Sequence, residues 1–246
     1  MNTEKNEGAP ASSGGGGLPW SGARSASRRR QTKETRIEAS LVLERGTVTV
    51  DSGIGFLDHM LSTLAFHAGF SLTLHCTGDL RVDDHHTAED CGIVLGELLG
   101  EALGKREGIV RFGYAYAPLD EALARAVVDI SGRPYSAVDL GLRRERLGEL
   151  SCENLGHLLS SFAQRAGLTL HVDVLRGEND HHRAEAAFKA LALALAAAVA
   201  LRPEALRLAG AAGGGGEALE GVGMASSGAA SGAAAGAAVP SLKGVL

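Results

Sequence analysis

Hydrophobic and polar positions along the chain follow one pattern twice. Apolar residues alternate with polar ones in short runs typical of strands, which lie at 37–43, 70–74, 122–130 and 168–172. Apolar residues at helical spacing fill two longer segments, 93–103 and 188–199. The pattern therefore predicts strands and helices in the same order in both halves of the chain.

Repeated motifs indicate that the two halves are copies of one unit. Leu57-Asp58-His59-Met60-Leu61 aligns with Leu155-Gly156-His157-Leu158-Leu159, and Asp84-His85-His86-x-x-Glu89 aligns with Asp180-His181-His182-x-x-Glu185. A repeat of this length is too long for a solenoid and indicates a duplicated half-domain. We expect an α+β fold in which each half reads strands, helix, strand, helix. Helices should cover one face of each mostly antiparallel sheet, and a pseudo-two-fold axis should relate the halves.

Composition sets the expected boundaries. Gly, Ala and Ser dominate 1–30 and 209–238, and such segments bury too little apolar surface to offset the entropy lost on ordering. We expect 1–30 to be a disordered tail and 209–238 to be a flexible insertion. The half-repeats are then expected at 31–118 and 119–208, with a C-terminal tail at 239–246.

Charge and cysteine content exclude several classes of protein. A net charge of −5 gives no reason to expect nucleic acid or an anionic membrane as partner. No run approaches the roughly 18 consecutive apolar residues that a membrane span needs. The 3 cysteines contain no CxxC pair, so neither a disulfide framework nor a zinc knuckle fits. Residues 1–17 lack the apolar segment of a secretory signal, and we therefore expect a cytoplasmic protein.

The repeat separates the histidines into two groups. His67, His75 and His171 have no histidine at the aligned position. The repeated group consists of three matched pairs, accompanied by a matched pair of glutamates: His59 and His157, His85 and His181, His86 and His182, and Glu89 and Glu185. Imidazoles and carboxylates that recur together indicate a site rather than solvent-exposed side chains.

The spacing of these residues predicts two metal ions. Asp84 and Asp180 occupy expected N-cap positions, so each His-His pair should open a helix. Adjacent helical residues point about 100° apart, so the two histidines of a pair should serve different ions. The repeated residues then suffice for three histidines and one glutamate per metal. The absence of thiolate ligands disfavours iron–sulfur clusters, copper(I) and structural zinc, but leaves manganese, iron(II), cobalt and zinc open.

Several longer motifs are similar to those of the imidazoleglycerol-phosphate dehydratase family. They are Gly53-Ile54-Gly55-Phe56-Leu57-Asp58-His59-Met60, Asp84-His85-His86-Thr87-Ala88-Glu89-Asp90, Ser131-Gly132-Arg133-Pro134-Tyr135, Gly177-Glu178-Asn179-Asp180-His181-His182 and Pro240-Ser241-Leu242-Lys243-Gly244-Val245-Leu246. The resemblance covers about 30–205 and the C-terminus. Leu242 departs from it, because Ser or Thr is usual there, and 209–238 is an insertion.

The resemblance implies a hydro-lyase of histidine biosynthesis with two Mn²⁺ ions per active site. It places one ion on His59, His86, Glu89 and His182, and the other on His85, His157, His181 and Glu185. It also implies a homo-oligomer of 24 subunits with sites at subunit contacts. The substrate would be D-erythro-imidazole-glycerol phosphate, dehydrated to imidazole-acetol phosphate with the metals as Lewis acids.

Further residues take roles by the same resemblance. Arg111, Arg133, Ser241 and Lys243 would bind the phosphate, which suits the bidentate geometry of arginine. Glu34 is the candidate for proton transfer, with His85, Glu89, His181 and Glu185 completing the expected catalytic set. His67 and Lys189 would also contact substrate, as would His59, His85, Glu89 and His181.

Two alternatives belong to other functional classes. A non-catalytic metal-binding or storage protein would have no use for the phosphate-binding set. A dinuclear metallohydrolase would normally rely on bridging Asp and Glu, whereas this site is rich in histidine.

Overall fold

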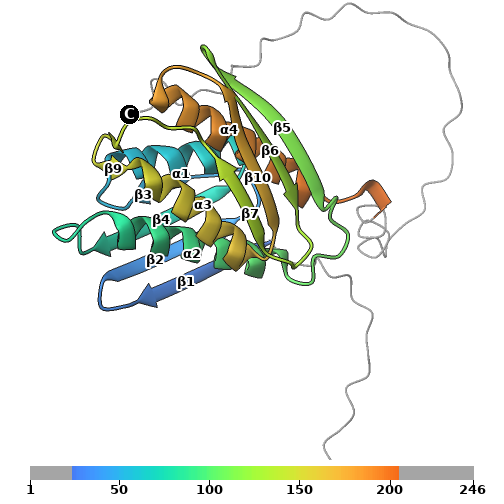
Figure 1. Cartoon of the computed structure of the whole chain (residues 1–246). Helices are drawn as coiled ribbons and strands as arrows, with labels where there is room; N and C mark the ends of the chain where they lie inside the picture. The colour runs from blue at the N-terminus through green and yellow to red at the C-terminus, as the bar shows by residue number, and fades with distance from the viewer. Residues whose placement is uncertain (1–23, 205–246) are drawn as a thin grey trace, which may run out of the picture.

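The computed structural model describes residues 24–204, which form two similar halves (Figure 1). The first half contains β1 (Ser25–Gln31), β2 (Thr35–Val42), β3 (Val48–Asp51), α1 (Gly55–Ala68), β4 (Ser71–Gly78) and α2 (His85–Leu103). The second contains β5 (Phe112–Leu119), β6 (Ala122–Asp129), β7 (Tyr135–Asp139), α3 (Cys152–Ala166), β10 (Thr169–Arg176) and α4 (Asp180–Val199). The expected order of strands, helix, strand, helix is therefore confirmed in both copies.

The two sheets share one topology. The first is ordered β1-β2-β4-β3 and the second β5-β6-β10-β7, so each strand has a counterpart at the same place. Strands β4 and β3 run parallel in the first sheet, and β10 and β7 run parallel in the second. The other neighbouring strands of both sheets are antiparallel, which confirms the prediction of mostly antiparallel sheets. Burial alternates along β2 and β6, because one face of each sheet lies against helices and the other does not.

Two expected boundaries need correction. Residues 25–30 are not part of a disordered tail, because they form most of β1 and pair with β2. Inward-facing Arg28 and Arg30 make this polar run a strand, since they pair with Glu97 and Asp90 of α2. The division between the halves also lies before residue 112, not at 118, because β5 belongs to the second sheet. The expected flexible insertion at 209–238 and tail at 239–246 lie outside the described residues.

The second half has a hairpin that the first half lacks. It consists of β8 (Arg146–Leu147) and β9 (Leu150–Ser151), which lie between β7 and α3. In the first half β3 is followed almost directly by α1. This insertion contacts both His-His helices, as described below.

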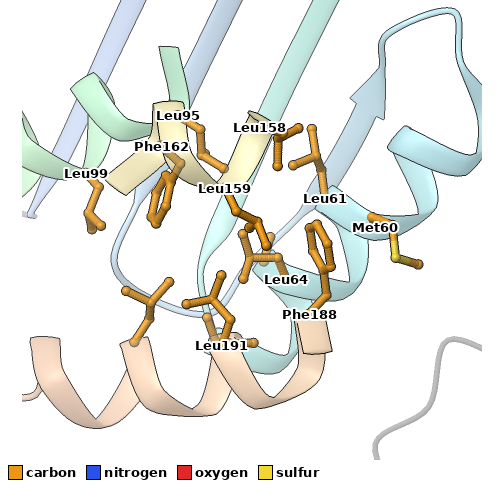
Figure 2. Close-up of a cluster of buried hydrophobic side chains, with 14 of the residues drawn as sticks. Met60, Leu61, Leu64, Leu95, Leu99, Leu158, Leu159, Phe162, Phe188 and Leu191 are labelled. Carbon is orange, nitrogen blue, oxygen red and sulfur yellow. The ribbon is translucent and has the colours of Figure 1, made fainter. Parts of the chain in front are cut away.

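The four helices form the middle layer between the sheets (Figure 1). Helix α1 packs against α4, and α2 packs against α3, so each contact joins the two halves. These pairs are equivalent when α1 is matched with α3 and α2 with α4, which is the arrangement that a pseudo-two-fold axis produces. Buried side chains from all four helices meet in this layer (Figure 2): Met60, Leu61, Leu64, Leu95, Leu99, Leu158, Leu159, Phe162, Phe188 and Leu191. Within 24–204 no helix has the length and apolar character to cross a membrane.

Glycines allow α2 to approach α3 closely. A Cβ added at Gly92 would lie 2.5 Å from the Leu158 carbonyl oxygen, and one at Gly96 would lie 2.4 Å from that of Phe162. Both neighbouring atoms belong to a helix backbone and cannot rotate away. The contact between these helices therefore depends on two positions without side chains.

We predict that Gly92→Ala lowers the free energy of unfolding by about 1–3 kcal/mol, because the helices must separate. Gly100→Ala is the matched control on the same helix, since its nearest neighbour would be an ordinary 3.8 Å away. That variant should be neutral or gain up to about 1 kcal/mol from the helix propensity of alanine. Thermal midpoints at one protein concentration test this, and equal behaviour of the two variants would contradict it.

Candidate metal centre

The first cluster of ligand-type side chains joins α1 to α4. His59 comes from α1, while His181 and Glu185 lie one turn apart on α4. Ring nitrogens of His59 and His181 lie 3.4 and 3.2 Å from the same Glu185 oxygen, and the three ligand atoms lie within 4.8 Å of one another. The hydrogen bond with His59 and the ion pair with Lys189 hold the pKa of the buried Glu185 well below its usual range. An anionic carboxylate between two imidazoles suits a divalent cation.

The second cluster is the counterpart of the first and joins α2 to α3. His85 and Glu89 lie one turn apart on α2, with 3.7 Å between the His85 Nε2 and a Glu89 oxygen. The ring of His157, from α3, lies 5.1 Å from that of His85 between centroids. Two histidines and one glutamate thus also meet on the opposite pair of helices.

The contacts within one chain group these residues differently from the metal assignment implied by the family resemblance, which describes sites formed between subunits and stays a prediction. That assignment placed His59 with Glu89, and Glu185 with His85 and His157. In the structure His59 lies against Glu185, and His157 lies against His85. The reason is the pairing of helices across the two-fold, which brings α1 to α4 and α3 to α2.

The second histidine of each pair contacts an acidic residue outside the cluster on its own helix. The rings of His85 and His86 are inclined at 75°, and those of His181 and His182 at 89°. The His86 Nδ1 lies 3.1 Å from Asp79, and the His182 Nδ1 lies 2.7 Å from Glu121. Adjacent histidines therefore face different surroundings, as the spacing predicted.

Several of these histidine rings have one nitrogen within hydrogen-bond distance of an oxygen acceptor. Nδ1 of His85 lies 2.9 Å from the amide oxygen of the buried Asn154. Nδ1 of His86 lies against the Asp79 carboxylate, and that of His182 against the Glu121 carboxylate. When Nδ1 donates a hydrogen bond, the lone pair of Nε2 is left to bind a metal. Metal-binding histidines are commonly oriented in this way. Sequence reasoning missed these three partners. Glu121 had a detectable signal, because it precedes β6 as Glu34 precedes β2.

Two buried aspartates attach the hairpin and the segment just before it to the His-His helices. Asp180 accepts hydrogen bonds from the backbone N–H groups of Arg143 and Arg144 at 2.9 and 2.7 Å. Asp84 accepts one from the Ser151 hydroxyl at 2.8 Å. Burial alone would raise the pKa of Asp84, but hydrogen bonds from Ser151 and Asn154 outweigh it and lower that pKa.

These contacts change the expected helix caps. Asp84 occupies the N-cap position of α2 but makes no capping hydrogen bond with its side chain. Asp180 is not the N-cap of α4, because Asn179 occupies that position and accepts from the His181 N–H at 2.9 Å. Both carboxylates instead accept hydrogen bonds from the hairpin or from the segment just before it.

Two further expected substrate contacts lie beside the first cluster. The Lys189 Nζ lies 2.9 Å from Glu185, one turn further along α4. His67, in the last turn of α1, has a pKa lowered by burial and by the nearby Lys189. The structure thus brings these two residues to the first cluster.

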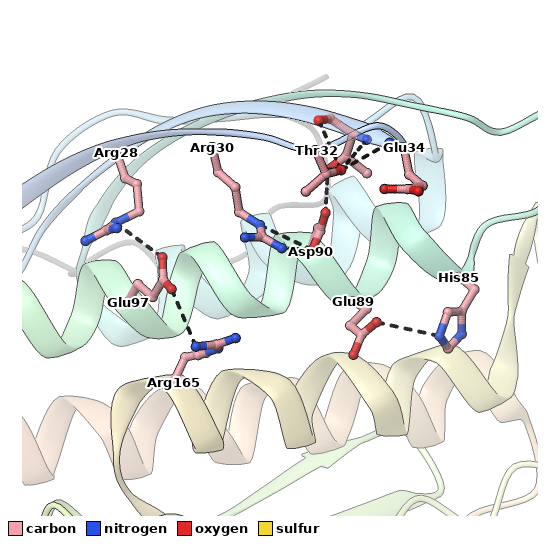
Figure 3. A network of polar contacts seen from close by, with 10 residues as sticks. Arg28, Arg30, Thr32, Glu34, His85, Glu89, Asp90, Glu97 and Arg165 are labelled. Carbon is pink, nitrogen blue, oxygen red and sulfur yellow. Dashed lines mark hydrogen bonds and ion pairs between the residues drawn. The ribbon is translucent and has the colours of Figure 1, made fainter.

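Glu34 occupies the turn between β1 and β2, above the N-terminal part of α2 (Figure 3). Its backbone N–H donates to the Thr32 hydroxyl at 3.1 Å. Asp79, chiefly, and Glu34 raise the pKa of His86, which places the Glu34 carboxylate near that ring. Glu34 therefore lies on the side of the second cluster.

Arg111 and Arg133 lie far from both clusters of the same chain. Both guanidinium groups pair with Asp129, Arg111 at 2.7 Å and Arg133 at 3.9 Å. The Arg111 N–H donates to Ala198, near the end of α4, about 20 Å along the helix from Glu185. A single chain does not bring these arginines to its own metal ligands. Ser241 and Lys243 lie outside the described residues.

Comparison with known proteins identifies the family. The family model of imidazoleglycerol-phosphate dehydratase matches residues 52–195. The imidazoleglycerol-phosphate dehydratase of Trichoderma harzianum is 62% identical over 166 residues, which cover 68% of this chain and 80% of that relative. That of Saccharomyces cerevisiae is 60% identical over 162 residues, which cover 64% and 74%. This chain belongs to the imidazoleglycerol-phosphate dehydratase family.

Solved structures of the dehydratase family are similar to this chain in fold. The Staphylococcus aureus enzyme superposes with a TM-score of 0.67 at 39% identity, covering 72% of this chain and 99% of that one. The Pyrococcus furiosus enzyme, solved in complex with (S)-C348, gives 0.63 at 38% identity, covering 72% and 95%. Membership of this dehydratase family does not favour the storage-protein or metallohydrolase alternatives.

We predict that Asp180→Ala lowers the free energy of unfolding by on the order of 2–4 kcal/mol, because two backbone N–H groups lose a charged acceptor. Asp83→Ala is the control, since the exposed Asp83 carboxylate accepts from the His85 N–H at the surface. It should cost less than about 1 kcal/mol. Denaturant titration of both variants checks this, and a small effect at Asp180 would show that the hairpin is not held by that carboxylate.

Proposed function

We propose that this chain removes water from D-erythro-imidazole-glycerol phosphate and releases imidazole-acetol phosphate, a step of histidine biosynthesis. The observation that carries the proposal is the pair of equivalent His-His-Glu clusters in a chain of the dehydratase family. The reaction breaks one C–O and one C–H bond. The hydroxyl leaves with a proton as water, and the resulting enol becomes the ketone.

Two Mn²⁺ ions fit the donor set. As the family resemblance implies, His59, His86, Glu89 and His182 would hold one ion, and His85, His157, His181 and Glu185 the other, with ligands drawn from neighbouring copies of the chain. Imidazole nitrogens and carboxylate oxygens suit Mn²⁺, and oriented rings with a free Nε2 support the assignment. When bound, the ions would supply Lewis-acid polarisation of the substrate's imidazole.

Residues of the chain itself would perform the remaining tasks. Glu34 would move the proton between substrate carbon and water, because it is a carboxylate beside the second cluster. Lys189 and His67 would contact the substrate beside the first cluster. Arg111 and Arg133 would bind the phosphate, which would replace Asp129 as their anionic partner.

We further propose that a complete site needs more than one copy of the chain. The backbone of Arg111 is held at Ala198, about 20 Å along α4 from Glu185 in the same chain, too far for one small substrate to reach both. His86 and His182 contact Asp79 and Glu121 rather than the clusters on their own helices, which supports their binding ions of neighbouring copies. This supports a homo-oligomer, and the family resemblance suggests 24 subunits.

We predict that the metal-stripped protein has no lyase activity on the substrate and regains it with added Mn²⁺. In addition, His59→Ala and His157→Ala should each lose about one of the two ions, because each removes one ligand from one cluster. His75→Ala is the control, since this exposed histidine pairs with Asp51 on the first sheet. Elemental analysis of metal per chain checks this. A full complement of ions in either cluster variant would contradict the ligand assignment.

We also predict that two inactive variants restore each other when they assemble together. Co-expressed His59→Ala and Arg133→Ala chains should recover up to roughly a quarter of wild-type activity, because random assembly leaves that share of two-chain sites intact. Co-expressed Arg111→Ala and Arg133→Ala chains form the control, since both guanidinium groups pair with Asp129 of one chain and would bind the same phosphate. Mixed oligomers without recovery would show that the arginines and the first cluster do not share a site across chains.

A further inference from the structure

A buried carboxylate links helix α2 to the strands on both sides of the Glu34 turn (Figure 3). Asp90 follows Glu89 on α2 and is 8% exposed. One of its oxygens accepts from the Arg30 guanidinium at 2.8 Å, and the other accepts from the Thr35 hydroxyl at 2.5 Å. Arg30 lies near the end of β1 and Thr35 begins β2, so a single side chain fixes both ends of the turn.

The turn itself is closed by local hydrogen bonds. The Thr32 N–H donates to the Thr35 carbonyl at 2.9 Å. The Thr32 hydroxyl accepts from the N–H groups of Glu34 and Thr35 at 3.1 and 2.9 Å. Glu34 is therefore held in a short, fully bonded turn whose position depends on Asp90.

The second half of the chain shows what the fold requires at these positions. Strand register and repeat alignment place Ala117 at the counterpart of Arg30, Ala122 at that of Thr35 and Ala186 at that of Asp90. All three alanines are at most 3% exposed. The same half-domain thus packs with three small apolar side chains in place of the polar network.

The energetics favour a functional reason for the network. Burying a carboxylate and part of a guanidinium costs desolvation energy, and well-packed apolar residues are often as stabilising as a buried ion pair. Since the second copy folds with alanines, the network in the first copy is not a requirement of the topology. What distinguishes the first copy is Glu34. Its counterpart Glu121 is held directly, by the N–H groups of Glu178 and Asn179 and by His182.

We infer that Asp90, with Arg30 and Thr35, is a positioning group that fixes the Glu34 carboxylate relative to the metal ligands on α2. Glu89 and Asp90 are neighbours on one helix, so a metal ligand and the support of the proton-transfer residue share one rigid element. This inference rests on the proposed dehydratase function for its catalytic consequence. Its structural part, the immobilised turn, is independent of that function.

The test uses the pair Thr35→Val and Thr35→Ser in the full-length, manganese-loaded protein. Valine keeps the shape of threonine but cannot donate to Asp90, whereas serine retains the hydroxyl. With Thr35→Val, hydrogen exchange at the amides of residues 32–35 should accelerate about 10-fold or more, while the exchange of α2 stays unchanged. The kcat should fall by on the order of 10- to 100-fold, with KM and the two bound ions per chain little changed. Thr35→Ser should match the wild type in every readout, and Asp90→Asn should repeat the result of Thr35→Val.

A double-mutant comparison decides whether the effect passes through Glu34. Glu34→Gln alone should lower kcat, and Thr35→Val should add no further loss in that background, because the positioned group is already absent. Additive losses, unchanged exchange in Thr35→Val, or loss of metal in that variant would overturn the inference. If the wild type has no lyase activity, the proposed function fails. The exchange measurement would still decide whether the network holds the turn.

Discussion

The structure depends on the packing of each helix against a helix of the other half. Helices α1 and α4 meet across the two-fold, as do α2 and α3, and the second contact is close because Gly92 and Gly96 carry no side chains. Each histidine–glutamate cluster takes one residue from one helix of such a pair and two from the other. Neither half alone can therefore build a cluster. The hydrophobic middle layer and the two clusters therefore depend on the same helix contacts.

Polar groups at the ends of the helices then orient the histidine side chains. A helix that opens on two histidines presents them next to its unsatisfied backbone N–H groups, where aspartates are favourable. Here the buried Asp84 accepts from Ser151 of the hairpin, and the buried Asp180 accepts from Arg143 and Arg144 just before it, so this insertion contacts the start of both α2 and α4. Asp79, Glu121 and Asn154 orient the rings further by accepting from Nδ1. Ligand geometry is thus fixed by residues that lie outside the clusters.

The sequence predicted the fold class and the set of clustered residues because duplication repeats both hydrophobic periodicity and chemistry. It did not predict which residues cluster together, since the pairing of α1 with α4 is a tertiary contact that local pattern does not encode. Strand β1 was missed because the Gly-, Ala- and Ser-rich composition of 1–30 favoured disorder, whereas Arg28 and Arg30 are paired with acids of α2. The N-cap of α4 was misplaced by one residue because Asn179 and Asp180 are both good capping types.

Sequence differences between the two copies make the surroundings of the two clusters unequal. A substrate with an imidazole at one end and a phosphate at the other is asymmetric, so two identical half-sites would not distinguish its orientations. Beside the first cluster lie Lys189 and His67, whose aligned positions next to the second cluster are Ile93 and Arg165. Beside the second cluster lies the Glu34 turn with its buried support, which in the other copy is replaced by alanines. Duplication supplies the paired clusters, and the unmatched residues around them give the two clusters different neighbours.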